Sequence, residues 1–237
     1  FTMTRHKWKR IRAKLEQDID EGVLKMGEQL PTEPLLAAQF GVGRHSVRRA
    51  IEALATQGKL EVCQGRGTFV EVAPRLTYSI GKRTRLHKNL VPLGVEVTSQ
   101  LLSADRVVAP GQVRRNLLLS QEAQVIQSRR ITLANNKPVS VGSIFHCATR
   151  FVDFVALRDT LGSTTLAYKK MGINDYIRAD TELHSRRPTA EEARTLKQHP
   201  DMPVIVVHAI DAELDGTPIS YSEVVWSSTR VIFKVSN

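Results

Sequence analysis

Basic side chains gather in a short stretch early in the chain, where they could contact a polyanion. Arg44, Arg48 and Arg49 lie within six residues, together with His45 and Ser46. Arginine can donate two parallel hydrogen bonds to O6 and N7 of guanine, so arginines on an exposed helix could read bases in the major groove of DNA. The alternative is a solvated basic face that binds nothing, and the surrounding elements must decide between the two.

Three predicted helices surround these arginines. Apolar residues at intervals of three and four indicate an amphipathic helix over residues 7–21, which Gly22 ends. A short second helix begins after Thr32, its expected N-cap. A third helix ends at Gly58 and carries the arginines in its first two turns.

The spacing of these elements is typical of a winged helix-turn-helix. Ala37, Gly41 and Val47 supply a small residue where two helices approach, a glycine for a left-handed turn and a branched anchor for the next helix. Two alternating strands follow, over residues 59–64 and 68–72. Between them lies a basic, glycine-rich tip formed by Gln64, Gly65, Arg66 and Gly67. The basic helix is therefore interpreted as a DNA-recognition helix.

Three separated blocks resemble the DNA-binding domain of the GntR family of bacterial transcription regulators: Leu30–Ala37, Val42–Ala50 and Gln64–Val70. The resemblance implies that Arg44 and Arg48 reach bases or phosphates and that the wing tip enters the minor groove. Many members carry an arginine where this chain has Pro34, so that DNA contact is missing here. Arg48 and Arg49 lie about 100° apart on a helix, so both are not expected to touch bases. The expected DNA-binding residues are Thr32, Arg44, His45, Ser46, Arg48, Arg49, Gln64, Gly65, Arg66 and Gly67.

The charge distribution agrees with a polyanionic partner. The chain has 237 residues, with 34 Lys and Arg against 24 Asp and Glu, and a net charge of +10. Residues 1–99 hold 17 basic and 10 acidic side chains, so +7 of that charge lies in this part. No apolar run is long enough to span a bilayer and the N-terminus has no signal-peptide core, so we expect a cytoplasmic protein without membrane association. Cys63 and Cys147 are expected to be buried reduced thiols.

A polar, basic stretch divides the chain in two. We expect a DNA-binding domain over residues 1–73, a linker over 74–84 and an effector-binding and dimerisation domain over 85–237. Lys82 and Arg83 of the linker, and Lys88 just after it, could extend the DNA footprint or line an anion pocket. The sequence leaves that choice open.

The second domain has the pattern of an α+β fold. Alternating apolar residues predict strands over 101–109, 125–133, 139–145, 180–186, 204–214 and 219–226. Helices are expected over 111–119, over 151–171 with a break at 162–164, and over 189–198, where Thr189 and Glu192 form a capping box. Asn136–Ser140 and Gly216–Ser220 are similar turns 80 residues apart, which predicts a duplicated hairpin and a pseudo-symmetric sheet.

The second domain shows no catalytic constellation. Glu191 and Glu192 are neighbours on a helix and face different ways, and the histidines lack metal-ligand spacing or a nucleophile partner. Nucleotide-binding glycine motifs are absent. We therefore expect no enzyme, no metal and no cofactor.

A second resemblance covers about residues 97–235. Three blocks are similar to the effector-binding (UTRA) domain of the HutC subfamily, which resembles chorismate lyase in fold but serves as a sensor: Ser128–Val139, Arg187–Ala193 and Asp215–Glu223. Shorter blocks, Thr84–Leu90 and Met171–Arg178, are similar to PhnF-type regulators of phosphonate metabolism. The resemblance implies that a small phosphonate, phosphate or related anion is the effector.

The chemistry of such a pocket calls for guanidinium groups, hydroxyls and backbone N–H groups, because a phosphonate carries three acceptor oxygens. Thr132 stands where sugar-phosphate sensors commonly carry a second arginine, which argues against a phosphorylated amino sugar. The alternative is that the arginines pair with acids across strands and that Tyr221 and Trp226 only pack. The expected effector-binding residues are Arg85, Asn89, Arg130, Thr132, Ser140, Tyr176, Arg178, Tyr221 and Glu223.

Together these features predict a homodimeric, ligand-responsive repressor of phosphonate uptake or metabolism genes. One recognition helix reads only a few base pairs, so a two-fold dimer on an inverted repeat is expected. Two other interpretations remain: a HutC-type regulator that senses another metabolite, such as a sugar phosphate, and, less favoured, an enzyme with a chorismate-lyase-like domain.

Overall fold

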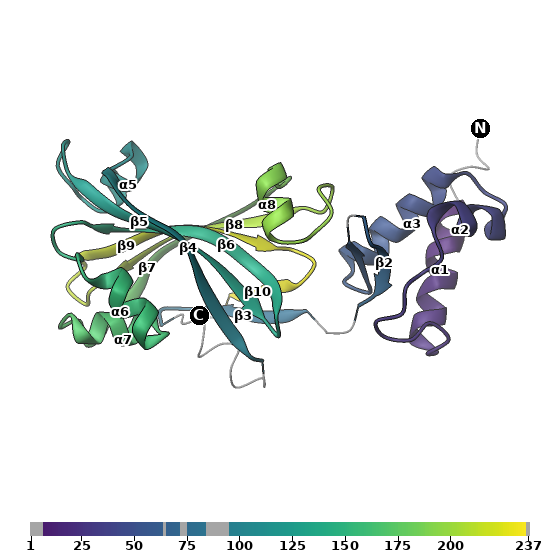
Figure 1. The fold of residues 1–237 in the computed structure, drawn as a ribbon, viewed down its shortest axis with the longest axis horizontal. Coiled ribbons are helices and arrows are strands. Elements are labelled where there is room, and N and C mark those ends of the chain that lie inside the picture. The colour runs from purple at the N-terminus through teal and green to yellow at the C-terminus, as the bar shows by residue number, and fades with distance from the viewer. Residues whose placement is uncertain (1–6, 64, 72–74, 84–94, 236–237) are drawn as a thin grey trace. The chain divides into compact units, whose positions relative to one another are not determined.

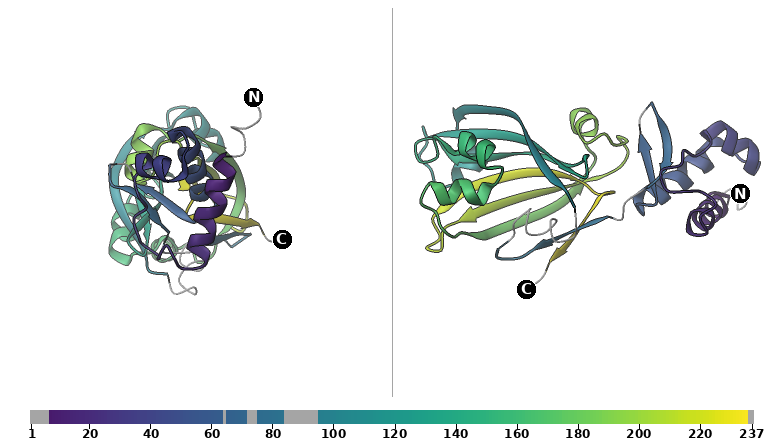
Figure 2. Two further views of the ribbon diagram at one scale, coloured as in Figure 1. Left: turned by 90° about the vertical axis from the view of Figure 1, so that its right-hand side faces the viewer. Right: turned by 60° about the horizontal axis from the view of Figure 1, so that its bottom comes forward.

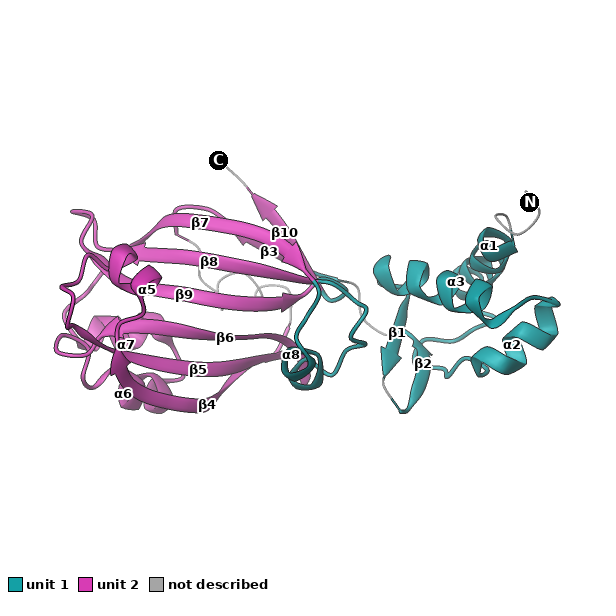
Figure 3. Ribbon diagram, turned by 90° about the horizontal axis from the view of Figure 1, so that it is seen from above, with its two compact units in different colours: residues 1–76, 187–203, 228–230 teal, residues 77–186, 204–227, 231–237 magenta. Residues whose placement is uncertain are grey.

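The computed structural model describes residues 7–63, 65–71, 75–83 and 95–235 (Figure 1). The chain divides into two compact units, coloured separately in Figure 3. Unit 1 contains residues 1–76, 187–203 and 228–230, and unit 2 contains the rest. Unit 1 therefore includes two segments from late in the chain, which the sequence-based boundaries assign to the second domain. Those sequence-based boundaries remain a prediction.

The first unit contains the expected three helices and hairpin. These elements are α1 (Lys7–Asp20), α2 (Glu33–Phe40), α3 (Arg44–Thr56), β1 (Leu60–Cys63) and β2 (Gly67–Val70). Gly41 ends α2 at φ 63°, a left-handed conformation that a residue with a Cβ adopts only at a cost. The helix-turn-helix and its antiparallel wing are therefore confirmed.

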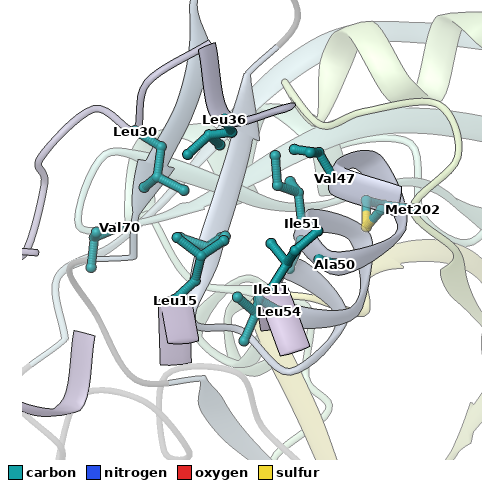
Figure 4. Packing of buried hydrophobic residues seen from close by; sticks show 12 residues of the cluster. Ile11, Leu15, Leu30, Leu36, Val47, Ala50, Ile51, Leu54, Val70 and Met202 are labelled. Carbon is teal, nitrogen blue, oxygen red and sulfur yellow. The ribbon is translucent and has the colours of Figure 1, made fainter. Parts of the chain in front are cut away.

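One apolar cluster holds this unit together (Figure 4). Ile11 and Leu15 of α1 pack with the buried face of α3, which includes Val47, Ile51 and Leu54. The helix α8 (Ala190–Thr195) carries the predicted capping box, and Met202 just after it completes the cluster. The side chain of Arg230 adds polar contacts, donating to the carbonyls of Leu196 and Lys197 and to the Glu61 carboxylate.

Six antiparallel strands form the main sheet of the second unit, in the order β4-β5-β6-β9-β8-β7. The strands are β4 (Val97–Val108), β5 (Gln124–Ala134), β6 (Lys137–Cys147), β7 (Ile177–Arg186), β8 (Val204–Ala212) and β9 (Pro218–Ser227). The hairpins β5–β6 and β8–β9 meet at the centre, where β6 pairs with β9. The predicted duplicated hairpin is thus confirmed, and each half adds one outer strand.

Two further strands were not expected. β3 (Leu76–Ile80) pairs with β10 (Val231–Val235) in a separate two-stranded sheet, so residues 76–80 of the predicted linker form a paired strand. This pair lies on the same face of the main sheet as α6 (Phe154–Leu161) and α7 (Thr164–Lys170), while α5 (Gly111–Asn116) covers the other face (Figures 1 and 2). Within the described structure neither cysteine is in a disulfide, and both are only partly buried, contrary to the expectation of buried thiols.

Among the described residues, no group of three or more His, Cys, Asp or Glu side chains is arranged to hold a metal ion. In the same part of the chain, no helix is long and apolar enough to cross a membrane.

His146 is fully buried beneath α6 and α7, and burial lowers its pKa to about 3. Its ring packs on Phe154 with centroids 3.9 Å apart, and its Nε2 lies 2.8 Å from the Tyr168 hydroxyl. The folded state therefore holds a neutral histidine, which the unfolded state protonates at about pH 6.5. His146 is a core residue and not a ligand-binding one.

We expect this burial to make the protein less stable as the pH falls. Between pH 6.5 and 3 the unfolded chain binds one more proton at this site, so the free energy of unfolding drops by about 1.4 kcal/mol per pH unit. His146→Gln should remove about 2 kcal/mol of the difference between pH 7.5 and pH 5, measured by urea unfolding. An unchanged difference in that variant would show that other groups cause the acid sensitivity.

Candidate functional site

The first turns of α3 present an exposed basic surface. Arg44, His45, Arg48 and Arg49 are exposed and Ser46 is half-buried, while the intervening Val47 and Ala50 are buried. Burial of the apolar positions fixes the helix on its core, and the helical period then turns the basic positions to solvent. This surface contains most of the residues predicted to bind DNA.

The three arginines of this surface have different environments. The Glu33 carboxylate accepts hydrogen bonds from Nε and Nη2 of Arg48 at 3.2 and 3.1 Å, and this pairing raises the pKa of Arg48. The Arg49 guanidinium lies over the Trp8 ring, 4.5 Å from its centroid. Within the described residues, Arg44 makes no hydrogen bond or ion pair. Arg44 is thus the guanidinium best able to take a base as its partner.

The backbone of the wing tip has a positive φ at both of its glycines. Gly65 and Gly67 have φ values of 73° and 113°, and the side chain of Gln29 donates to the Arg66 carbonyl at 2.9 Å. The Arg66 guanidinium lies 5.8 Å from the Phe69 ring centroid. Thr32 is exposed and its hydroxyl makes no capping hydrogen bond. Gln64 lies outside the described residues.

Arg44→Ala should strongly weaken sequence-specific DNA binding without unfolding the protein, because Arg44 is exposed and unpaired in the described structure. A bidentate arginine–guanine contact contributes about 1–3 kcal/mol, so a loss of about tenfold or more in affinity is expected. Fluorescence anisotropy with a selected duplex measures it. Arg49→Ala is the matched control and should weaken binding far less, since Trp8 holds that side chain; equal losses would contradict the assignment.

A cavity of about 390 Å³ lies on the inner face of the six-stranded sheet. Cross-strand neighbours of β6 and β9 line it together, with Ser140 opposite Trp226 and Ile144 opposite Ser222. Its volume falls within the range of about 300–1,000 Å³ typical of small-molecule sites. The lining includes five residues predicted to bind the effector: Arg130, Thr132, Ser140, Tyr176 and Arg178.

Two of the cavity arginines have acidic partners. Arg130 donates to the Ser99 hydroxyl at 3.1 Å and pairs with Asp159 at 2.6 Å, but its buried Nη1 has no hydrogen-bond partner in the described structure. Arg178 pairs with Asp211 at 2.7 Å, and both side chains are 16% exposed. The expected acid pairing is therefore present, yet it leaves one donor of Arg130 buried and unsatisfied.

Arg158, on α6, is a cavity residue that sequence reasoning missed. Its side chain is buried and its Nε donates to the Thr164 hydroxyl at 3.0 Å. Burial, with a further effect of the positive charge on Arg130, lowers the pKa of Arg158 to about 10. No ion pair of Arg158 is found in the described part of the chain. The sequence feature that could have pointed to Arg158 is its position a few residues before the hydroxyl-rich segment Ser163–Thr165.

Tyr221 and Glu223 lie away from this cavity. Alternate residues of β9 line the cavity, from Ser220 to Trp226, so Tyr221 and Glu223 point to the opposite face. There the Tyr221 hydroxyl accepts from Gln112 at 2.6 Å and lies 3.4 Å from the Glu223 carboxylate. Tyr221 packs with Val113 of α5, and Glu223 accepts from the Tyr221 hydroxyl.

The remaining predicted contacts belong to the linker region. Arg85 and Asn89 lie outside the described residues, as does Lys88. Arg83 forms an ion pair with Asp175, which occupies it within unit 2.

Arg130→Gln should leave DNA binding intact and weaken the response to effector. It removes the unsatisfied Nη1 donor and leaves Asp159, which is 42% exposed and can be solvated. Loss of a charge-assisted hydrogen bond of about 1.5–3 kcal/mol corresponds to a roughly tenfold or larger loss of effector affinity, measurable by calorimetry. Arg178→Gln should instead destabilise the fold, because it leaves the carboxylate of Asp211, which is only 16% exposed, without its ion-pair partner. A normal effector response in Arg130→Gln would remove Arg130 from the site.

The geometry defines a class of protein: a DNA-reading winged helix joined to a domain with a ligand-sized cavity. Residues 7–70 match the model of the bacterial regulatory proteins of the gntR family, and residues 93–232 match the UTRA domain. The chain belongs to the GntR family of transcription regulators, with a UTRA domain of the HutC/PhnF type. It is a ligand-responsive regulator that binds DNA through its first domain.

Several characterised or named relatives span nearly the whole chain. An uncharacterised transcriptional regulator of Rhizobium meliloti is 32% identical over 96% of this chain and 93% of its own length. The repressor MngR of the mannosyl-D-glycerate transport and metabolism system and the probable regulator PhnF, both of Escherichia coli, are 27% and 29% identical, each over 91% of this chain and 89% of theirs. The crystal structure of PhnF from Mycobacterium smegmatis has the same fold, with a TM-score of 0.65 and 23% identity over 96% of this chain and 98% of that one.

Proposed function

We propose that this protein is a repressor of phosphonate uptake or metabolism genes, which releases its operator when a phosphonate- or phosphate-type anion binds in the cavity. The observation that carries the proposal is the buried positive charge of Arg158, which forms no ion pair in the described structure, although Asp159 lies near enough to act on it electrostatically. An anion with several acceptor oxygens would satisfy both Arg158 and the free Nη1 of Arg130. The relative named PhnF supports the phosphonate assignment.

The hydroxyl groups around Arg158 suit such an anion. Thr164 already accepts from Arg158, and the Thr165 hydroxyl lies 3.1 Å from that of Tyr176. Hydroxyls can donate to phosphonate oxygens while the guanidinium groups balance the charge. The cavity therefore offers both kinds of donor that a tetrahedral oxyanion requires.

A sugar-phosphate effector is the second candidate. Serine and threonine side chains line much of the cavity, including Ser99, Thr132, Ser140 and Ser220, and could bind sugar hydroxyls. The relatives named MngR, NagR and the probable fructoselysine operon repressor favour a carbohydrate-derived ligand. The same anion-binding arginines would serve both classes.

The DNA-bound form is proposed to be a homodimer on an inverted repeat, acting in the cytoplasm where the DNA lies. Two recognition helices related by a two-fold axis match half-sites separated by about 10 base pairs or a multiple. Effector binding would favour a dimer geometry in which the helices no longer fit successive major grooves. The effector can shift that equilibrium only by its difference in affinity for the two states.

Selection of a duplex from a random pool, followed by anisotropy with candidate effectors, tests this proposal. We expect an inverted repeat to be selected and a phosphonate or phosphate ester to release the protein from it, while sulfate at equal ionic strength does not. The same compounds should raise the melting temperature of the full chain, because a ligand specific to the folded state stabilises it. Stabilisation by sugar phosphates alone would favour the second candidate. Failure of every anion to stabilise or release the protein would overturn the proposed effector class.

A further inference from the structure

We propose that the effector carries an apolar or aromatic body attached to its anionic group, so that a bare oxyanion is only a fragment of it. This inference rests on the proposed function and names the ligand class more closely. The cavity has two chemically different sides, and a ligand must match both to exclude water from it.

An aromatic corner forms one side of the cavity. Tyr78 of β3, Trp226 of β9 and Phe233 of β10 all line it. Their ring centroids lie 5.0 Å apart for Tyr78 and Trp226, 5.6 Å for Tyr78 and Phe233, and 5.4 Å for Trp226 and Phe233. Three rings in mutual contact form a preorganised apolar surface, which binds an apolar or flat group better than it binds water.

Apolar side chains continue this corner along the sheet. Val207 of β8 and Val224 of β9 are cross-strand partners that line the cavity, and Ile80 follows Tyr78 two residues later on the same side of β3. None of these side chains can donate to an anion. Apart from the Arg178–Asp211 ion pair, in which the two charges neutralise each other, the corner and these residues make a largely apolar wall from β3, β8, β9 and β10.

The charged side of the cavity comes from other elements. Arg158 and the hydroxyls of Thr164 and Thr165 belong to α6, α7 and the turn between them, while Arg130 belongs to β5. The anion would bind here, where the unpaired charge and the unsatisfied Nη1 lie. The ligand body would then extend over the inner sheet face toward the aromatic corner.

The volume of the cavity agrees with this arrangement. At about 390 Å³ it holds roughly thirteen water volumes, each about 30 Å³. Phosphate has five heavy atoms and methylphosphonate has one carbon in place of an oxygen, so either would leave the aromatic corner in contact with water. A larger apolar body would replace that water and gain the free energy of burying apolar surface.

Calorimetry on the full chain with a graded set of ligands tests the inference. The probes are phosphate, methylphosphonate, benzylphosphonate and glucose 6-phosphate, which differ in the body but share the anionic head. We expect benzylphosphonate to bind at least tenfold more tightly than methylphosphonate, a difference of about 1.4 kcal/mol. Equal binding of the two phosphonates, or tightest binding of glucose 6-phosphate, would overturn the inference and leave the anion-responsive function standing. Failure of all four probes to bind would overturn both.

Matched variants locate the ligand body. Phe233→Leu should weaken benzylphosphonate at least fivefold and leave methylphosphonate unchanged, and Trp226→Phe, which keeps a ring, should act in the same direction. Phe145→Leu is the control, because Phe145 packs against Tyr221 on the other face of the sheet. Arg158→Gln should weaken both phosphonates. A benzylphosphonate affinity that neither Phe233→Leu nor Trp226→Phe changes would place the body elsewhere and overturn the assignment.

Discussion

The burial of guanidinium groups on one face of a sheet is the constraint on which the effector domain depends. Moving a charge out of water costs several kcal/mol unless an opposite charge accompanies it. Asp211 accompanies Arg178 and Asp159 accompanies Arg130, whereas in the described part of the chain Arg158 donates to the hydroxyl of Thr164 and forms no ion pair. The lowered pKa of Arg158 reflects the desolvation that remains uncompensated. The fold thereby maintains a positive charge that an anionic ligand can neutralise.

The alternation of side chains along β9 determines which residues face the cavity that holds this charge. Ser222 and Val224 face the cavity, while Tyr221 faces α5 and is buried among Phe145 and Val113. Packing of the outer face holds the strand in register, and the register holds the cavity residues opposite their partners on β6. The recognition helix uses the same principle at the helical period, because burial of Val47 directs Arg44 and Arg48 to solvent.

The local sequence pattern predicted the helices, strands and turns more accurately than the residues of the effector cavity. The turns at Gly41, Asn136 and Gly216 could be found from sequence because their residue types favour the left-handed backbone, and the duplicated hairpin followed from the similarity of the turns at Asn136 and Gly216. β3 and β10 were missed, because their partners are more than 150 residues apart and no short-range signal marks the pairing. Tyr221 and Glu223 were predicted from a motif. On β9 their side chains alternate with that of Ser220, so they point to the opposite face of the sheet from the cavity. Arg158 lacked a motif, since only the tertiary fold brings α6 to Arg130.

The position of Tyr78 bears on how a ligand could act at a distance. β3 is the first described element after the wing strand in the chain, and it carries Tyr78 into the cavity wall. A ligand that touched only Arg158 would bind with the same affinity whatever the conformation of β3. Such a ligand could not shift an equilibrium between two conformations of β3, because its affinities for them would be equal. A ligand that also covers Tyr78 distinguishes states that differ at β3. The apolar body would then supply the difference in affinity, and the anionic head would supply most of the shared binding.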